Sequence, residues 1–285
     1  IPDFKLEKSI IDRRVEILIL EGIKFKTNIE VGIDIPIKKL KKDNDVVLLC
    51  GGATIMRKLP IPGHELAGIV QAMHFLKMQN QVIRENFKDV HELNAKNKNV
   101  IVIGGGDTGS DCIGTSNRQG AKSVVNFEIL PKPSKQRTDE NPWPYWPFTL
   151  KTSSSHEEGS KRQWSILTKE FIDDGNGNVK ALKTIEVEWI KKPNEKAKLV
   201  EIEGSEKVWP CDLVLLALGF TGPDNQIIHN LKLNADNFSK PLTKKYQTSD
   251  KKVFAAGDLR RGQSLIVWAI SEGREAAYEI DKFLM

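Results

Sequence analysis

The sequence predicts an α/β fold built around buried parallel strands, and three observations support that class. An unbroken apolar run, Val100–Ile103, leads directly into the glycine turn Gly104-Gly-Gly-Asp-Thr-Gly109. A second apolar run covers 124–130, and a later segment, 252–258, again ends in a glycine and an acid. Short apolar runs bounded by turns are typical of strands that are buried on both faces.

Composition narrows the class of protein further. A chain of 285 residues suffices for one large or two ordinary domains, and its net charge of +5 is only mildly basic. The densest cluster, Lys38–Lys42, lacks interleaved aromatic residues, so we interpret it as a solvated face and not as a nucleic-acid patch. No apolar stretch reaches about 18 residues, so we expect no membrane partner.

The three cysteines argue against several kinds of site. Cys50, Cys112 and Cys211 are far apart, and none forms a Cys-x-x-Cys pair. This spacing disfavours a metal centre, a locally encoded iron–sulfur cluster and a dithiol redox centre. It favours an intracellular, reducing compartment, and Ile1 opens into charged sequence unlike a signal peptide.

The first third of the chain predicts two helices, several strands and a boundary between domains. Residues 6–20 carry apolar side chains at helical spacing, 23–31 reads as strands, and 46–49 predicts a buried strand running into Gly51 and Gly52. The segment Leu59-Pro-Ile-Pro-Gly63 is a stiff connector, where we place a crossing between domains. Residues 67–84 then read as a helix.

The later part predicts one more helix, several strands and a terminal helix. The pattern of 164–172 looks helical, 179–190 and 198–208 alternate like antiparallel strands, and 212–218 is a buried strand ending at Gly219. Residues 264–284 predict a helix. The proline- and aromatic-rich stretch 131–147 is either a cofactor or partner contact or a plug of the core, and the sequence leaves this open.

The glycine turn is the first candidate site. Gly104 permits a tight turn out of the strand, Gly106 lets a pyrophosphate approach the backbone, and Gly109 lets the helix lie close to the sheet. Gly105, Asp107 and Thr108 complete the turn. The N–H groups at the start of the new helix would bind phosphates, which predicts a dinucleotide site.

An acid and a base lie downstream of this turn. Glu128 follows Gly109 by nineteen residues, at the end of the next apolar run, where a carboxylate can accept hydrogen bonds from ribose hydroxyls. The same charge would repel a 2′-phosphate, which favours NADH. Arg137, nine residues later, could instead pair with a 2′-phosphate, so NADPH also stays open as the coenzyme.

A second candidate site lies near the C-terminus. A strand delivers Gly257 and Asp258 to a sheet end, where an acid can accept a hydrogen bond from a ribityl hydroxyl of a flavin. Gln263, Ser264 and Leu265 open a helix whose free N–H groups would stabilise charge on the pyrimidine edge of FAD. The alternative is that Asp258 is an ordinary turn carboxylate. Gly51, Gly52 and Gly219 end two similar strands, which we interpret as crossings between two nucleotide-binding units.

These motifs together resemble the small, β-type subunit of glutamate synthase, of which the chain looks like the C-terminal two-thirds. The resemblance covers nearly the whole chain, and Phe127-Glu-Ile-Leu-Pro131 is similar to its NADH-dependent branch. The main matching segments are 1–8, 52–54 with 59–63, 104–112, 127–131, 141–147, 214–220 and 255–274.

The resemblance implies an adrenodoxin-reductase-like flavoprotein, in which an NAD(P)-binding Rossmann-like domain is inserted into an FAD-binding domain. Residues 1–62 would belong to a partial FAD domain, 63–220 to the NAD(P)H domain and 221–285 to the C-terminal FAD segment. NADH would reduce FAD, and electrons would pass through an iron–sulfur domain outside this chain to the large subunit, which makes glutamate from glutamine and 2-oxoglutarate. No catalytic side chain is expected, because the chemistry belongs to the cofactors.

Two competing functions remain at this point. Another reductase of the same superfamily is disfavoured by Asn141-Pro-Trp-Pro144 and by Arg261-Gly-Gln-Ser-Leu265. A non-catalytic piece that only binds nucleotide or a subunit stays open, because the family's FAD glycine turn and cysteine-rich cluster domain have no counterpart in these residues.

Overall fold

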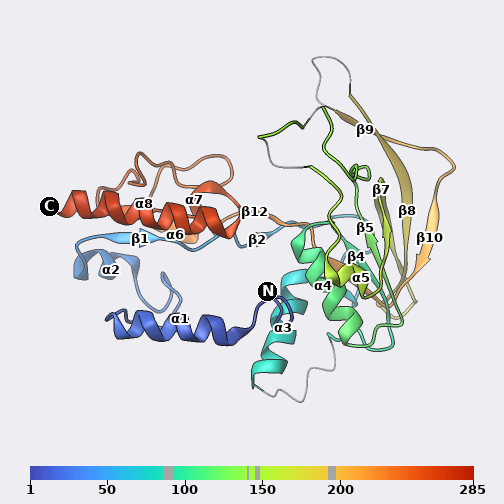
Figure 1. Ribbon diagram of the computed structural model, residues 1–285, viewed down its shortest axis with the longest axis horizontal. Coiled ribbons are helices and arrows are strands. Elements are labelled where there is room, and N and C mark those ends of the chain that lie inside the picture. The colour runs from blue at the N-terminus through green and yellow to red at the C-terminus, as the bar shows by residue number, and fades with distance from the viewer. Residues whose placement is uncertain (86–92, 140, 145–147, 192–196) are drawn as a thin grey trace. The chain divides into compact units, whose positions relative to one another are not determined.

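The computed structural model describes residues 1–85, 93–139, 141–144, 148–191 and 197–285 (Figure 1). These form two compact units. Unit 1 comprises Ile1–Asp12 and Lys58–Leu218, and unit 2 comprises Arg13–Arg57 and Gly219–Met285. The expected crossings at 59–63 and Gly219 lie beside these boundaries, whereas residues 1–12 pack in unit 1. Which cofactor each unit binds stays a prediction.

Unit 1 is organised around a five-stranded sheet in which every pair of neighbours is parallel. Its central strands are almost wholly buried, as their apolar sequences predict. The strands, in spatial order, are β3 (Ile69–Gln71), β11 (Leu213–Leu216), β4 (Asn99–Ile103), β5 (Ser123–Phe127) and β6 (Lys161–Gln163).

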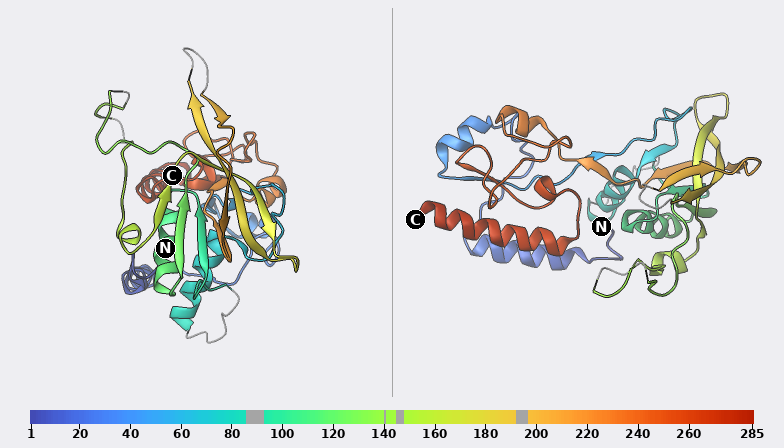
Figure 2. Two further views of the ribbon diagram at one scale, coloured as in Figure 1. Left: turned by 90° about the vertical axis from the view of Figure 1, so that its right-hand side faces the viewer. Right: turned by 90° about the horizontal axis from the view of Figure 1, so that it is seen from above.

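Helices cover one face of this sheet and a second sheet covers the other (Figures 1 and 2). Helices α3 (Ala72–Glu85) and α4 (Asp107–Arg118) bury apolar side chains against β4 and β11. The opposite face packs on an antiparallel sheet. That sheet contains β7 (Ile166–Asp173), β8 (Val179–Ile190), β9 (Lys198–Glu201) and β10 (Lys207–Pro210).

One predicted element of unit 1 is wrong in type, and another begins later than predicted. Residues 164–172 form no helix, because most of them belong to β7, which pairs along its length with the twelve-residue β8. Ile166 and Phe171 of β7 are buried in the core between the sheets, so tertiary pairing decides the conformation there. The predicted helix at 67–84 begins only at Ala72, because 69–71 adds β3 to the parallel sheet.

Unit 2 is smaller and contains a two-stranded parallel pair, β1 (Val47–Leu49) with β13 (Val253–Ala255). A second, antiparallel pair joins β2 (Ile55–Met56) to β12 (Phe220–Gly222). Its core gathers side chains from both parallel strands and from the short helices. The helices are α2 (Ile37–Asp43), α6 (Gln226–Asn230), α7 (Asp258–Arg261) and α8 (Ile266–Leu284), while α1 (Lys8–Leu20) spans the boundary.

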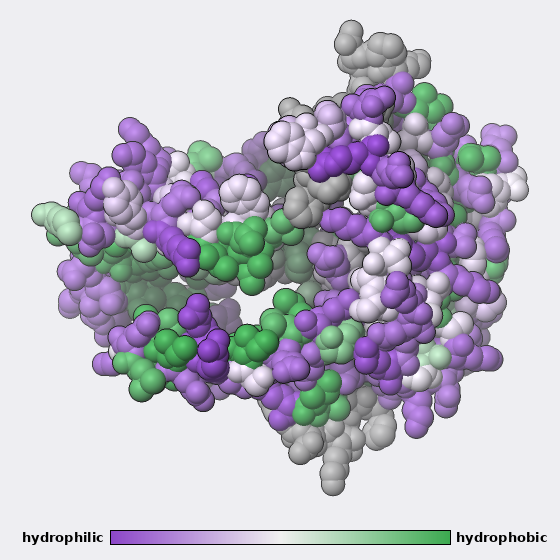
Figure 3. All heavy atoms as spheres, viewed as in Figure 1, coloured by the Kyte–Doolittle hydropathy of each residue, from purple (hydrophilic) through white to green (hydrophobic). Residues whose placement is uncertain are grey.

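Unit 2 lacks one pair of predicted strands and exposes apolar side chains on its last helix. The predicted strands at 23–31 are absent, and only an isolated bridge joins Val31 to Ile35. Hydrophobic side chains gather at the start of α8, where Ile266 and Val267 are exposed (Figure 3).

Within the described ranges, no helix has the length and apolar character needed to span a bilayer.

Candidate functional site

The glycine turn of unit 1 joins β4 to α4, and each of its glycines meets a different constraint. A Cβ atom on Gly104, whose φ is +118°, would lie 2.2 Å from the carbonyl oxygen of Ala217. A Cβ on Gly109 would lie 2.2 Å from the carbonyl oxygen of Gly104, so the helix can approach the strand only because this Cβ is missing. A Cβ on Gly106 would meet nothing within 4 Å, and this glycine lines an open cavity.

The start of α4 offers unpaired donors to this cavity. Gly106 is the N-cap residue, and no side chain caps the helix. The first N–H groups of an α-helix have no intrahelical acceptor, and the helix dipole adds positive potential there. Asp107 lines the cavity beside them, whereas Thr108 does not. The arrangement is suited to an anion such as a pyrophosphate.

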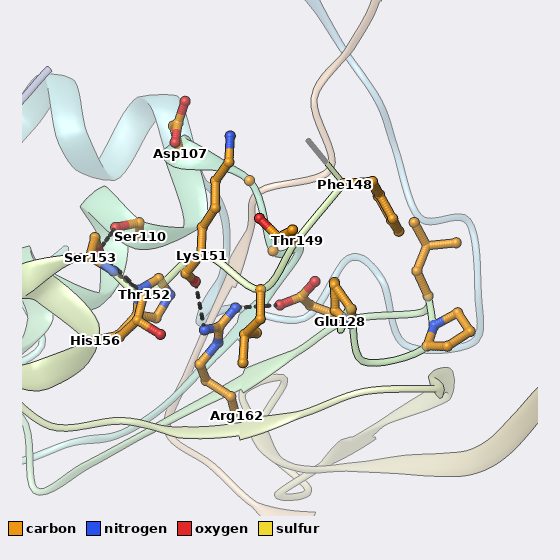
Figure 4. A pocket seen from close by; sticks show the side chains of 16 residues that line it. Asp107, Ser110, Glu128, Phe148, Thr149, Lys151, Thr152, Ser153, His156 and Arg162 are labelled. Carbon is orange, nitrogen blue, oxygen red and sulfur yellow. Dashed lines mark hydrogen bonds and ion pairs between the residues drawn. The ribbon is translucent and has the colours of Figure 1, made fainter. Parts of the chain in front are cut away.

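The cavity has a volume of about 680 Å³ and is bounded by five segments of unit 1 (Figure 4). The turn and the end of β5 form one side, and residues 148–153, α5 (Ser154–Glu157) and β6 contribute others. Pro131, Pro133 and Phe148 also line it. This position and the 80% exposure of Trp143 argue against a core plug and leave a cofactor or partner contact for the described part of the proline-aromatic stretch. Tyr145 and Trp146 lie outside the described residues.

Glu128 lies at the end of β5, next to the turn. The Cβ atom that Gly105 lacks would fall 2.0 Å from Cδ of Glu128, so the carboxylate occupies that space. Arg162 Nη2 lies 3.1 Å from Glu128 Oε1, and both side chains are less than one-fifth exposed. No local sequence pattern indicates this pair, because Arg162 is 34 residues away from Glu128 and only the pairing of β6 with β5 brings the two together.

A buried amide supports the turn from below. Asn126 of β5 is fully buried, and its Nδ2 donates to the carbonyl oxygens of Val102 and Gly104 at 3.1 and 3.0 Å. These bonds fix the end of β4 and the first residue of the turn. A polar residue within an otherwise apolar run was the only sequence signal for this role.

A histidine and two serines form another wall of the cavity. Nδ1 of His156 accepts a hydrogen bond from the backbone N–H of Ser153 at 3.1 Å, and Oγ of Ser153 lies 2.6 Å from Oγ of Ser110 (Figure 4). Burial, together with the charges of Arg162 and Lys5, lowers the pKa of His156 to about 4. The imidazole is therefore neutral near pH 7 and adds no positive charge to the cavity.

Arg137, the predicted counterweight to Glu128, lies elsewhere. It does not line the cavity, and its guanidinium donates to the carbonyl oxygen of Asn141 at 3.4 Å. Among the described residues, the cations that line the cavity are Lys151 and Arg162. The described structure therefore brings Glu128 together with Arg162 and does not bring it together with Arg137.

In unit 2 the predicted flavin residues form a hydrogen-bonded loop. Gly257 follows β13 with φ +71°, and Asp258 begins α7. Ser264 Oγ donates to Asp258 Oδ1 at 2.9 Å, and Gln263 Nε2 donates to the carbonyl oxygen of Phe220 at the same distance. Helix α8 starts two residues later than predicted, with Leu265 as an N-cap that supplies no side-chain bond.

A buried acid that the sequence did not flag holds this loop. Glu272 of α8 is 2% exposed and accepts a hydrogen bond from the backbone N–H of Gly257 at 2.8 Å. Arg260 and Arg261 pair with the same carboxylate. Burial alone would raise the pKa of Glu272, but the bonds from Arg260 and Gly257 outweigh it and hold the pKa below 4.5. The ionised carboxylate ties α8 to the turn after β13.

The remaining predicted glycines lie at chain turns of unit 2. A Cβ on Gly51 would approach Leu259 to 3.2 Å, and Gly52 has φ +77°. Gly219 has φ +75°, and its carbonyl oxygen accepts a bond from the N–H of Arg57. Gly52 and Gly219 therefore adopt a conformation that favours glycine.

Known proteins resemble this chain along its whole length. Glutamate synthase [NADH] of Schizosaccharomyces pombe is 46% identical over 99% of the chain, and the glutamate synthase [NADPH] small chain of Bacillus subtilis is 45% identical over 100%. A putative glutamate synthase [NADPH] small chain of Cereibacter sphaeroides is 34% identical over 100%. The chain spans 14%, 59% and 67% of the lengths of these relatives, respectively.

A family model and a solved structure agree with these relatives. The model for pyridine nucleotide-disulphide oxidoreductases matches residues 164–273. Mycobacterium tuberculosis FprA in complex with NADPH superposes with a TM-score of 0.69, at 16% identity, over 90% of this chain and 67% of FprA. That likeness establishes the fold class, an α/β flavoprotein fold of the adrenodoxin-reductase-like type. Together with the relatives, it shows that the chain belongs to the glutamate synthase small-chain family.

Proposed function

We propose that this chain is the electron-input part of a glutamate synthase, binding NADH in unit 1 and FAD through unit 2. The observation that carries the proposal is the uncapped start of α4, with open space at Gly106 and the carboxylate of Glu128 beside it. This combination is what a dinucleotide requires, namely donors for its pyrophosphate and an acceptor for its ribose.

In unit 1, the chain's own residues bind and orient the nucleotide. The N–H groups at the start of α4 would hold the pyrophosphate, because no side chain competes for them. Glu128 would accept hydrogen bonds from the adenosine ribose hydroxyls. Asn126 and Gly109 support both contacts by fixing the turn against β4.

In unit 2, the fit to a flavin rests on the loop after β13. Asp258 presents a carboxylate that Ser264 already orients, and α8 begins without a side-chain cap. Such a helix start would stabilise negative charge on the pyrimidine edge of the ring system. FAD would supply the chemistry of hydride acceptance, and no side chain here needs to act as an acid or a base.

The preference for NADH is supported by Glu128, whose charge disfavours a 2′-phosphate. The names of the relatives do not decide it, because the NADH and NADPH types are 46% and 45% identical to the chain. Arg137 offers no counter-charge in the cavity. We therefore retain NADH as the preferred donor, with NADPH as the weaker one.

The wider reaction and its partners follow from the family. We infer that electrons leave the flavin through an iron–sulfur domain outside these residues and reach a large subunit or domain. There they would support the formation of glutamate from glutamine and 2-oxoglutarate. The free cysteines, two of them buried, support a reducing intracellular compartment.

Anaerobic titration of the purified chain tests the proposal. After incubation with FAD and removal of the excess, the chain should retain flavin absorbance, and NADH should bleach it. A colourless chain that still binds NADH would support the alternative of a piece that only binds nucleotide. A chain that binds neither NADH nor FAD would contradict both functions.

A further inference from the structure

The ion pair between Glu128 and Arg162 lies beside the glycine turn, where the proposed site would hold the adenosine ribose of a dinucleotide. Both side chains line the cavity, Glu128 from the residue that follows β5 and Arg162 from the middle of β6 (Figure 4). A 2′-phosphate differs from a 2′-hydroxyl mainly by about two negative charges at neutral pH. The discrimination therefore depends on the net charge that this pair presents. The inference rests on the proposed nucleotide site.

The guanidinium of Arg162 is held in place from several sides. Nη2 pairs with Glu128, and Nη1 donates to the carbonyl oxygen of Lys151 at 2.9 Å. The guanidinium also lies over the ring of Trp164, at 4.9 Å from its centroid. Nε is buried and has no hydrogen-bond partner among the described residues. A cation in this position is a fixed part of the cavity wall.

Arg162 changes what Glu128 presents to a ligand. The pair uses Oε1 of Glu128, while Oε2 lies over the turn, next to the place where a Cβ of Gly105 would be. Oε2 can therefore accept from a ribose hydroxyl while Arg162 offsets the charge of the carboxylate. Lys132 does not line the cavity, but its Nζ lies 4.8 Å from the ring centroid of Trp164, on which Arg162 also lies.

We propose that Arg162 is the residue that sets the coenzyme discrimination of this site. By offsetting Glu128 it permits weaker binding of the 2′-phosphorylated nucleotide, where an unpaired carboxylate would exclude it. Two like charges a few ångströms apart repel strongly in a half-buried site, and an opposite charge in contact removes most of that penalty. The chain accordingly prefers NADH but also accepts NADPH.

Calorimetric titration of the full chain with ADP-ribose and with 2′-phospho-ADP-ribose at pH 8 tests this role without any need for flavin. R162M keeps the length of the apolar stem and removes the charge. It should raise the dissociation constant of 2′-phospho-ADP-ribose by about tenfold or more, and that of ADP-ribose by less than about threefold. R162K keeps the charge and should retain most of the wild-type ratio.

A matched control removes a similar ion pair outside the cavity. Arg118 of α4 pairs with Glu158 at 2.6 Å and does not line the cavity, so R118M should leave both dissociation constants unchanged. An equal change for the two ligands in R162M, or a loss in R162K as large as in R162M, would overturn the role of Arg162 alone. Failure of the wild-type chain to bind either ligand would refute the nucleotide site itself.

Discussion

Glu128 occupies the space that a side chain on Gly105 would need, since an ideal Cβ there would fall 2.0 Å from Glu128 Cδ. The middle glycine of the turn is therefore coupled to the acid at the end of the next strand. The turn and the proposed ribose acceptor, Glu128, are therefore coupled. The missing side chain of Gly105 after β4 leaves the space that the carboxylate after β5 occupies.

This coupling predicts the effect of Gly105→Ala. The new methyl group should displace the carboxylate and break its pair with Arg162, because the far end of a side chain moves more easily than the backbone. We expect the dissociation constant of NADH to rise about tenfold, while the free energy of unfolding falls by only about 1 kcal/mol. Calorimetry and chemical denaturation measure the two effects, and unchanged NADH binding would argue against the coupling.

Two valine substitutions in the same turn should affect different properties, one of them nucleotide binding and the other stability. Gly106→Val adds methyl groups to open space at φ −79°, so the fold should persist while NADH binding is lost. Gly109→Val places a Cβ 2.2 Å from the carbonyl oxygen of Gly104 and should destabilise unit 1 by about 3 kcal/mol. Thermal denaturation of each variant, with and without NADH, separates the two. Equal losses of stability would contradict the assignment of separate roles.

Replacing Glu272, the buried acid of unit 2, should cause a large loss of stability. Glu272→Gln removes the charge that Arg260, Arg261 and the N–H of Gly257 share, and breaking such a buried cluster costs about 3 kcal/mol. Glu279→Gln is the control on the same helix, since the ion pair that Glu279 forms with Lys245 is long, at 3.9 Å, and Glu279 does not contact the turn after β13. Denaturant unfolding should show a change of less than about 1 kcal/mol for the control.

The histidine in the cavity wall predicts the pH dependence of stability. The pKa of His156 is lowered to about 4 from its ordinary 6.5, so the unfolded chain takes up a proton that the folded chain excludes. The contribution of His156 to stability should therefore fall as the pH drops from 6.5 towards 4. His156→Gln should flatten the free energy of unfolding over this range. A slope equal to that of the wild type would exclude His156 as its source.

Local patterns in the sequence predicted the central strands and the turn. The buried strands at 100–103 and 213–216 are continuous apolar runs, which predict buried strands directly. The spacing of the glycines predicts the turn, because each glycine stands where a side chain would block the backbone or a ligand. The apolar spacing of residues 164–172 fits a helix as well as a strand. Only pairing with β8, whose residues follow later in the chain, decides for a strand.

Arg162 and Glu272 could not be predicted from the sequence, for the same reason in both cases. Arg162 meets Glu128 through the pairing of β5 with β6, and Glu272 meets Gly257 through the fold of unit 2, at separations of 34 and 15 residues. Neither arginine nor glutamate is unusual in its own segment, so no local signal marks them. Arg137 is near Glu128 in sequence, but in the structure its guanidinium donates to the carbonyl oxygen of Asn141.

Titration of NADH and NADPH into the wild-type chain and into Glu128→Ala tests the central claim most directly. The variant loses the ribose acceptor and leaves Arg162 without its partner, so NADH should bind about tenfold more weakly, whereas NADPH should bind as well as before or better. Equal losses for the two nucleotides, or no loss for either, would remove Glu128 from the ribose site and contradict the account.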